Sequence, residues 1–280
     1  MGQAFTKRLV ECGFAVTGCD LVPEKVTQAA RHGVEPAASP ADVARASDIV
    51  LACVTSTHDV EEAVLGKGGV AEVPSRGKVL VDHSTTEIGE TKHFAAELKQ
   101  RAGMDWVDAP VSGGPTAAAA GTLAIMAGGE AAAIRQVEPV MAKLAGRFTH
   151  MGGIGAGQVT KMINQVLVLT NYAVIAEALR LGEKCGVDVS RIPEALAAGY
   201  AGSNLLKDLT PRMVARDFAP RGFARQVLKD LDMVHDLSKE MKSPTPMTAQ
   251  AASLFRILVA RGHSELDGCA ILKLYLDEPI

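Results

Sequence analysis

A lysine followed at helical spacing by two amides is the most chemically suggestive group in this sequence. Lys161, Asn164 and Gln165 occupy positions i, i+3 and i+4, so a helix presents all three on one side. A lysine on an apolar-rich helix can exchange a proton with a substrate, and nearby amides can hold a hydroxyl or a carboxylate. From these residues alone, the alternative is a lysine that extends to solvent beside amides that bond to neighbouring backbone.

A second candidate group is the glycine-rich turn in DAPVSGG, residues 108–114. Ser112 supplies a hydroxyl, and the flexible backbone amides of Gly113 and Gly114 follow it directly, which suits the binding of a carboxylate. An ordinary glycine turn is the alternative. Lys229 and Asp230, on a later helical stretch, are interpreted on their own as an ion pair on a solvated face.

The first twenty residues have the order helix, strand, acidic residue that follows the glycine-rich turn of a dinucleotide-binding unit. Asp20, at the end of the strand, would accept hydrogen bonds from ribose hydroxyls and repel a 2′-phosphate, which favours NAD over NADP; a surface Asp that opens a turn is the alternative. Gly2 fits only the third glycine of a GxGxxG turn. We therefore expect Met1 to be an internal methionine, with the central strand and two glycines upstream of it.

The first half of the chain alternates short apolar strands with helical patterns, which favours a parallel α/β sheet because each parallel return needs a crossover. The expected strands are 14–19, 48–54, 78–84, 104–113, 122–129 and 147–153. The expected helices are 2–12, 23–33, 39–47, 57–66, 86–103 and 130–145.

From Gly157 the pattern becomes purely helical, beginning with a stretch of about eight turns that ends at Gly186. Further helical segments are expected at 193–199, 203–217, 222–242, 245–262 and 267–278. The prediction is a dinucleotide-binding domain over 1–153 and an all-helical domain over 154–280.

Composition narrows the range of partners. A net charge of −3, an aromatic content of 4% and scattered Lys and Arg argue against nucleic acid, so we expect a small-molecule partner. The five cysteines are dispersed and form no metal-binding or disulfide pattern, which favours reduced thiols in the cytoplasm and no metal. Charged and amide side chains interrupt the apolar stretch 159–181, so we expect no membrane span.

The order of three motifs carries a family resemblance. DAPVSGGPTAAAAGTLAIMAGG, then GGIGAGQVTKMINQ, then GFARQVLKDL resembles the β-hydroxyacid dehydrogenases, which include 3-hydroxyisobutyrate dehydrogenase and tartronate semialdehyde reductase. The resemblance covers essentially the whole chain. It implies an α/β Rossmann-type domain, a long interdomain helix and an all-α domain, with hydride transfer between NAD and a small β-hydroxyacid.

The resemblance also assigns roles to individual residues. It makes Lys161 the general acid/base of catalysis. It implies a substrate-binding group made of Ser112, Gly113, Gly114, Asn164 and Gln165. It implies a cofactor-binding group made of Gly2, Asp20, Val54, Thr55, Thr85 and Lys229.

Two positions depart from the family pattern, Gln165 in a way that bears on the substrate and Thr55 only as a local loop difference. Gln165 replaces the asparagine of the 3-hydroxyisobutyrate enzymes, which tilts the substrate towards a more polar hydroxyacid such as tartronate semialdehyde. Thr55 stands where the family often has proline. Imine reductases lack a lysine at the position of Lys161, which argues against them. A truncated relative that binds a small carboxylate but not NAD remains the alternative, and the apolar helices make a homodimer or homotetramer plausible.

Overall fold

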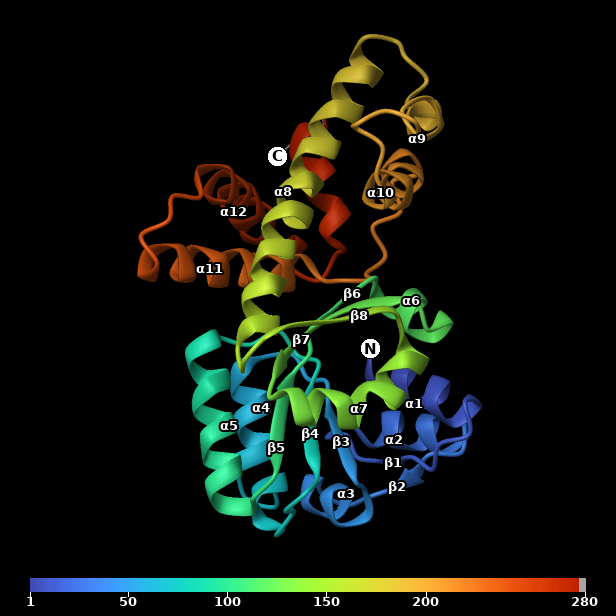
Figure 1. The fold of residues 1–280 in the computed structure, drawn as a ribbon. Coiled ribbons are helices and arrows are strands. Elements are labelled where there is room, and N and C mark those ends of the chain that lie inside the picture. Colours follow the sequence, from blue (N-terminus) through green and yellow to red (C-terminus); the bar gives the residue numbers. More distant parts are fainter. Residues whose placement is uncertain (277–280) are drawn as a thin grey trace. The chain divides into compact units, whose positions relative to one another are not determined.

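The computed structural model describes residues 1–276, which divide into two compact units, residues 1–161 and the chain from Met162 onward. Figure 1 shows both, with the long helix α8 belonging partly to each. The division falls inside α8 (Ala156–Lys184).

The first unit has the predicted alternation of strands and helices. Its strands are β1 (Thr17–Gly18), β2 (Glu35–Pro36), β3 (Ile49–Ala52), β4 (Val79–Asp82), β5 (Asp105–Asp108), β6 (Val111–Ser112), β7 (Leu123–Gly129) and β8 (Ala145–Gly152). Its helices besides α8 are α1 (Gly2–Glu11), α2 (Pro23–Ala30), α3 (Pro40–Ala46), α4 (Thr57–Leu65), η1 (Val70–Glu72), α5 (Ile88–Ala102), α6 (Gly114–Ala120) and α7 (Ala131–Leu144).

The sheet is mixed rather than wholly parallel. Strands β3, β4 and β5 are parallel neighbours, as expected, but β7 runs antiparallel to β5 and β6 and parallel to β8. The reversal is possible because the short β6–α6 segment returns the chain without a full crossover. Within residues 1–276, β1 pairs only with β2, so these two strands form a separate small sheet.

Strand β4 shows why helices cover both faces of the larger sheet. Its alternate residues point to opposite sides. Val79 and Val81 pack in one apolar cluster with residues of α1, α6 and α7, while Leu80 packs in another with residues of α3, α4 and α5. The arrangement is therefore three-layered, and an uninterrupted apolar run suits a strand that is buried on both faces.

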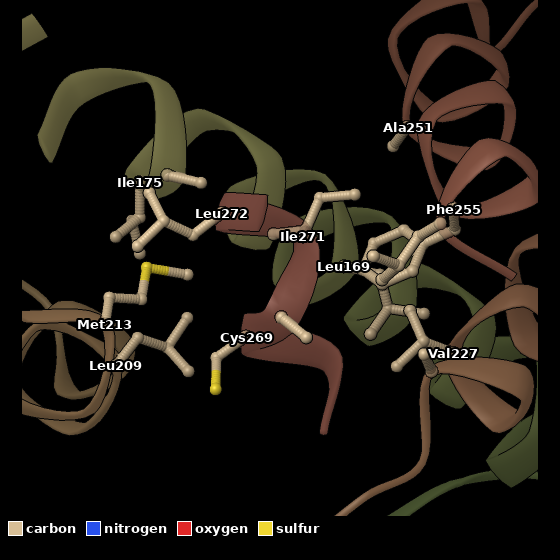
Figure 2. Packing of buried hydrophobic residues seen from close by; sticks show 14 of the residues in the cluster. Leu169, Ile175, Leu209, Met213, Val227, Ala251, Phe255, Cys269, Ile271 and Leu272 are labelled. Atoms are coloured by element: carbon tan, nitrogen blue, oxygen red, sulfur yellow. The ribbon is translucent and has the colours of Figure 1, made fainter. Parts of the chain in front are cut away.

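The second unit is helical throughout its described part. After α8 its elements are η2 (Val189–Arg191), α9 (Ile192–Ala195), α10 (Asn204–Val214), α11 (Ala224–Glu240), α12 (Pro246–Leu258), η3 (Val259–His263) and η4 (Gly268–Tyr275). Figure 2 shows its core, in which Ile271 and Leu272 of η4 lie among side chains of α8, α10 and α12. The last predicted helix, 267–278, is instead the 3₁₀ helix η4, and its final two positions lie outside the described residues.

A buried ion pair fixes the start of η4. Arg212 Nη1 lies 2.9 Å from Asp267 Oδ1, and both side chains are almost fully buried. Burial alone would raise the pKa of Asp267, but the backbone amides of Cys269, Arg221 and Gly222 outweigh it and hold that pKa below its ordinary value. The pair ties α10 to the C-terminal segment.

Helix α8 is long and apolar enough to cross a membrane by length and composition alone, with a mean hydropathy of 1.4 in its most apolar window. Its first turns do not face lipid, because Gln158 and Lys161 are buried and bond to backbone carbonyls of the first unit. A core helix of a globular protein satisfies the same criterion.

Candidate active site

Two glycines allow α8 to begin directly on the sheet. A Cβ atom at Gly157 would lie 2.5 Å from the carbonyl oxygens of Asp108 and Met126, so only glycine fits between the helix and strands β5 and β7. Gly155 has a φ of +92°, a backbone conformation that side chains other than glycine rarely adopt. The glycine spacing thus brings the first turns of α8 onto the ends of the strands.

Lys161 is held one turn further along the helix. Its side chain is only 8% exposed, and its Nζ donates a hydrogen bond to the carbonyl oxygen of Val111 at 2.8 Å. Val111 is the neighbour of Ser112 in β6, so the ammonium group lies beside the predicted carboxylate-binding turn. The structure therefore brings together two groups that lie some fifty residues apart in the sequence.

The turn after Ser112 has the geometry that only glycines allow. Gly113 and Gly114 have φ values of +124° and +69°, and both are exposed. Gly113 precedes helix α6 and Gly114 begins it, with no capping side chain bonded there. Backbone amides are consequently available near Ser112, as binding of a carboxylate requires.

Asp108, at the carboxyl end of β5, anchors the start of α8. Its Oδ1 accepts a hydrogen bond from the amide of Gly155 at 2.7 Å, and its Oδ2 accepts one from the amide of Gln158 at 3.0 Å. Burial raises the pKa of Asp108 above its ordinary value, although these amides oppose the shift. This carboxylate therefore fixes the helix that carries Lys161.

The segment after β4 holds the predicted nicotinamide contact, Thr85. Ser84 Oγ accepts a hydrogen bond from the amide of Val54 at 2.9 Å, which joins this segment to the loop after β3. Val54 and its neighbour Thr55 are exposed, whereas Ser84 and Thr86 are buried on either side of Thr85. Three of the predicted cofactor residues thus lie on two adjacent loops at one edge of the sheet.

Two buried titratable groups lie next to these loops. Burial raises the pKa of Asp82 to about 7, and the neighbouring charge of Asp108 contributes to the rise. Burial also lowers the pKa of His83 to about 4, so the ring is neutral near pH 7. The Nδ1 atom of His83 is 2.7 Å from the carbonyl oxygen of Ala109, and its ring packs against Phe5 of α1.

The region around β1 and α1 fits a dinucleotide. Helix α1 begins at Gly2 with no capping side chain bonded at its start, and no heavy atom lies within 4 Å of the position a Cβ on Gly2 would take. Such a helix start favours a phosphate group. Asp20 Oδ1 accepts a hydrogen bond from the amide of Val22 at 2.9 Å, so the carboxylate opens a turn. It also lies 3.7 Å from Lys25 Nζ, whose charge partly offsets that of the carboxylate.

The predicted residues of the second unit form a polar network of their own. Asn164 Nδ2 donates to Gln165 Oε1 at 2.8 Å, and Gln165 Nε2 donates to Asp230 Oδ2 at 2.5 Å. Lys229 Nζ is 3.0 Å from Asp230 Oδ1. Asp230 therefore forms the ion pair that the sequence suggests and, in addition, joins α11 to α8.

Comparisons with known proteins agree with this geometry. The family model for the NAD-binding domain of 6-phosphogluconate dehydrogenase matches residues 1–153, and the model described as NAD-binding of NADP-dependent 3-hydroxyisobutyrate dehydrogenase matches residues 155–275. The chain is 38% identical to 2-hydroxy-3-oxopropionate reductase of Escherichia coli strain K12 over 231 residues, which cover 82% of this chain and 79% of that protein. The chain belongs to the β-hydroxyacid dehydrogenase family.

Further similarities support this membership. L-threonate dehydrogenase of Cupriavidus necator is 33% identical over 98% of this chain and 93% of its own length. The crystal structure of 3-hydroxyisobutyrate dehydrogenase from Salmonella typhimurium superposes with a TM-score of 0.89 at 26% identity, covering 98% of this chain and 95% of that one. This β-hydroxyacid dehydrogenase is accordingly an NAD(P)-binding oxidoreductase, and the non-catalytic alternative is not favoured.

Sequence reasoning missed two buried groups of the site. Asp108 lies in the DAPVSGG motif and Gln158 in the GQVTK segment, but neither motif predicts a role for them. Their partners lie far along the chain, and only the fold identifies them. Among residues 1–276, the structure shows no group of three His, Cys, Asp or Glu side chains that could hold a metal ion.

Proposed function

We propose that this β-hydroxyacid dehydrogenase transfers hydride between NAD(H) and a small, polar β-hydroxyacid or the corresponding semialdehyde acid, with Lys161 as general acid/base. The observation that carries the proposal is the buried Lys161, whose Nζ is fixed at 2.8 Å from the backbone of the strand that holds Ser112. A titratable amine that is held in place and shielded from water can accept or donate a proton in the reaction.

The nicotinamide supplies the hydride acceptor or donor when it is bound. The protein's part is to place the proton acceptor. In oxidation, Lys161 takes the proton of the β-hydroxyl group; in reduction, the protonated lysine donates to the oxygen that develops negative charge. Proton transfer by a positioned side chain typically contributes about 10²–10⁴-fold in rate.

The remaining predicted residues receive binding roles in the same proposal. Ser112 Oγ and the amides after it hold the substrate carboxylate, which brings the hydroxyl group to Lys161 through proximity and orientation. In the second unit, Asn164 and Gln165 contact the substrate and Lys229 the cofactor. Gln165 favours a polar substrate, and the E. coli relative named 2-hydroxy-3-oxopropionate reductase supports a substrate resembling tartronate semialdehyde or glycerate. 3-Hydroxyisobutyrate is the less polar candidate.

We assign the cofactor preference to NAD. The support is the carboxylate of Asp20 after β1, which would accept ribose hydroxyls and repel a 2′-phosphate. Gly2 at the start of α1 receives a phosphate, and Val54, Thr55 and Thr85 line the nicotinamide or its ribose.

We also propose a homodimer or homotetramer that works in the cytoplasm. Helix α8 exposes a row of apolar side chains along one side: Val159, Ile163, Leu167, Val174 and Leu181. An apolar row of this length favours burial against another copy of the chain. Light scattering after size exclusion tests this, and a single monomeric species would contradict it.

The experiment for the function is a panel of β-hydroxyacids, measured by nicotinamide absorbance with NAD⁺ and NADP⁺ in parallel. Glycerate, 3-hydroxyisobutyrate, L-threonate and L-serine form the panel, with the corresponding 3-oxo acids for the reverse direction. The proposal predicts turnover with a polar member and a higher kcat/KM with NAD⁺. Turnover of none of them, together with absent NADH binding by fluorescence, would refute it.

A further inference from the structure

Gln158 connects three separate segments through hydrogen bonds. Its side chain is fully buried; its Oε1 accepts from the amide of Thr86 at 3.2 Å, and its Nε2 donates to the carbonyl oxygen of Ser84 at 2.8 Å. Its own backbone amide donates to Asp108. One side chain therefore fastens both ends of the three-residue segment 84–86 to the first turn of α8.

Gln158 links the two residues that act together in the proposed reaction, Thr85 and Lys161. Thr85 lies between the two residues that the amide of Gln158 holds. Lys161 is three residues beyond Gln158 on the same helix, so the two side chains lie about one turn apart. The Gln158 amide thus sets the position of the Thr85 segment relative to the helix that carries Lys161.

Only an uncharged side chain with both a donor and an acceptor satisfies the two partners. Methionine has a similar length but would leave the Thr86 amide and the Ser84 carbonyl without a side-chain partner in a buried place. An ionised glutamate could accept from Thr86 but would direct an acceptor at the Ser84 carbonyl. A protonated glutamate, by contrast, has a donor and an acceptor and can replace glutamine at both contacts.

We propose that Gln158 is a positioning residue for hydride and proton transfer, holding the Thr85 segment and the Lys161 helix in one fixed arrangement. The inference rests on the proposed function, in which Thr85 contacts the nicotinamide and Lys161 exchanges the proton. Displacements of about 1 Å can cost about 10²-fold in rate, even when the displaced group does not react.

The test compares Gln158→Met and Gln158→Glu with matched variants of Gln136. Gln136, on α7, is exposed and also donates a side-chain hydrogen bond to a backbone carbonyl, that of Gly77 at 2.9 Å. Gln136→Met and Gln136→Glu therefore make the same chemical changes away from the site. We expect Gln158→Met to lower kcat about 10- to 100-fold while the NADH dissociation constant stays within about threefold of wild type.

The glutamate variant gives a result that a merely structural role would not produce. Asp108 accepts a hydrogen bond from the backbone amide of Gln158 and Asp82 accepts one from that of Ser84, so both carboxylates would raise the pKa of a glutamate at position 158. Positive charge on Lys161, one turn further along α8, and on Lys92 of α5, whose side chain lies beside Gly155, would lower that pKa. As pH falls and the glutamate protonates, the ratio of the variant's kcat to that of the wild type rises, to within about threefold of unity. The same ratio for Gln136→Glu stays near unity at every pH.

Hydrogen exchange provides a readout that does not depend on turnover. Peptides covering residues 84–91 should exchange faster in Gln158→Met than in the wild type and remain unchanged in Gln136→Met. Unchanged exchange in these peptides would overturn the inference. So would a kcat ratio for Gln158→Glu that does not vary with pH, or a loss of stability with kcat unchanged.

The proposed function fails on different results. If the wild type turns over no hydroxyacid, or if Lys161→Ala keeps its turnover, that function is wrong. The exchange result still decides in either case whether Gln158 fastens the segment.

Discussion

The close approach of α8 to the sheet predicts a strong effect of adding a single methyl group at Gly157. In Gly157→Ala the new Cβ would lie 2.5 Å from two backbone carbonyl oxygens, about half an ångström less than the 3.0 Å below which real Cβ atoms are essentially never found. Gly153 is the matched control, because nothing lies within 4 Å of the position that its Cβ would take. The two substitutions add the same group four residues apart.

The expected magnitude follows from opposing contributions. Overpacking costs about 1–3 kcal/mol, and displacing the amides that bond to the carboxylate of Asp108 costs about 1.5–3 kcal/mol more. The better helix propensity of alanine returns about 0.8–1.0 kcal/mol. The net loss for Gly157→Ala is about 1.5–5 kcal/mol, or about 3–20 °C in Tm for a unit of this size. Gly153→Ala should instead equal the wild type or gain up to about 1 kcal/mol.

Urea unfolding followed by tryptophan fluorescence is the appropriate assay. Trp106 is the single tryptophan of the chain, is 2% exposed and lies in β5, so its emission reports the unfolding of the first unit. The expected result is a lower midpoint for Gly157→Ala with an unchanged slope. Equal midpoints for the two alanine variants would show that α8 does not approach the strands as closely as described.

Three further predictions concern separate parts of the molecule. Asp20→Ser should weaken NADH binding about tenfold and reduce the preference over NADPH, because a charge-assisted acceptor is lost; fluorescence titration measures it, and an unchanged ratio of dissociation constants would contradict it. Burial raises the pKa of Asp82 to about 7, so the contribution of Asp82 to the free energy of unfolding falls as pH rises from about 4 to 7. Burial lowers the pKa of His83 from 6.5 to about 4, so the contribution of His83 rises over pH 4 to 6.5. Asp82→Asn should therefore gain stability more steeply between pH 4 and 6.5 than the wild type does. If the free energies of unfolding in urea of the two proteins change in parallel with pH, Asp82 and His83 do not act in opposite directions. Arg212→Met should cost about 3–5 kcal/mol, because it leaves the carboxylate of Asp267 buried without its partner; thermal unfolding by circular dichroism tests this, and a Tm equal to that of the wild type would exclude it.

Local patterns predicted the layers of the first unit well. The apolar runs of β3 to β5 and the helical patterns between them indicate a sheet covered on both faces, and Val79 and Leu80 do pack on opposite sides. The antiparallel direction of β7 was not predicted, because an apolar run has the same pattern in either direction. Helix α6 was also not predicted, although Pro115 near its start and Gly121 after its end mark a helix.

The site divides in the same way. Lys161 and the Ser112 turn could be located from motifs, because each chemistry depends on residues that are close in the sequence. Gln158 could not be given a role, and the contact of Asp230 with Gln165 could not be foreseen, since these partners lie 65 to 74 residues away. Gln158 contacts backbone atoms of Ser84 and Thr86, which any residue type would supply, so the sequence holds no signal for that contact.

The most direct test of the central claim is Lys161→Ala, compared with the wild type in turnover of the best hydroxyacid and in NADH affinity. The account predicts that kcat falls by at least about 10²-fold, because the proton acceptor is removed, while the NADH dissociation constant changes little. A variant that keeps a tenth or more of the wild-type kcat would show that another group exchanges the proton, and the assignment of Lys161 would be wrong.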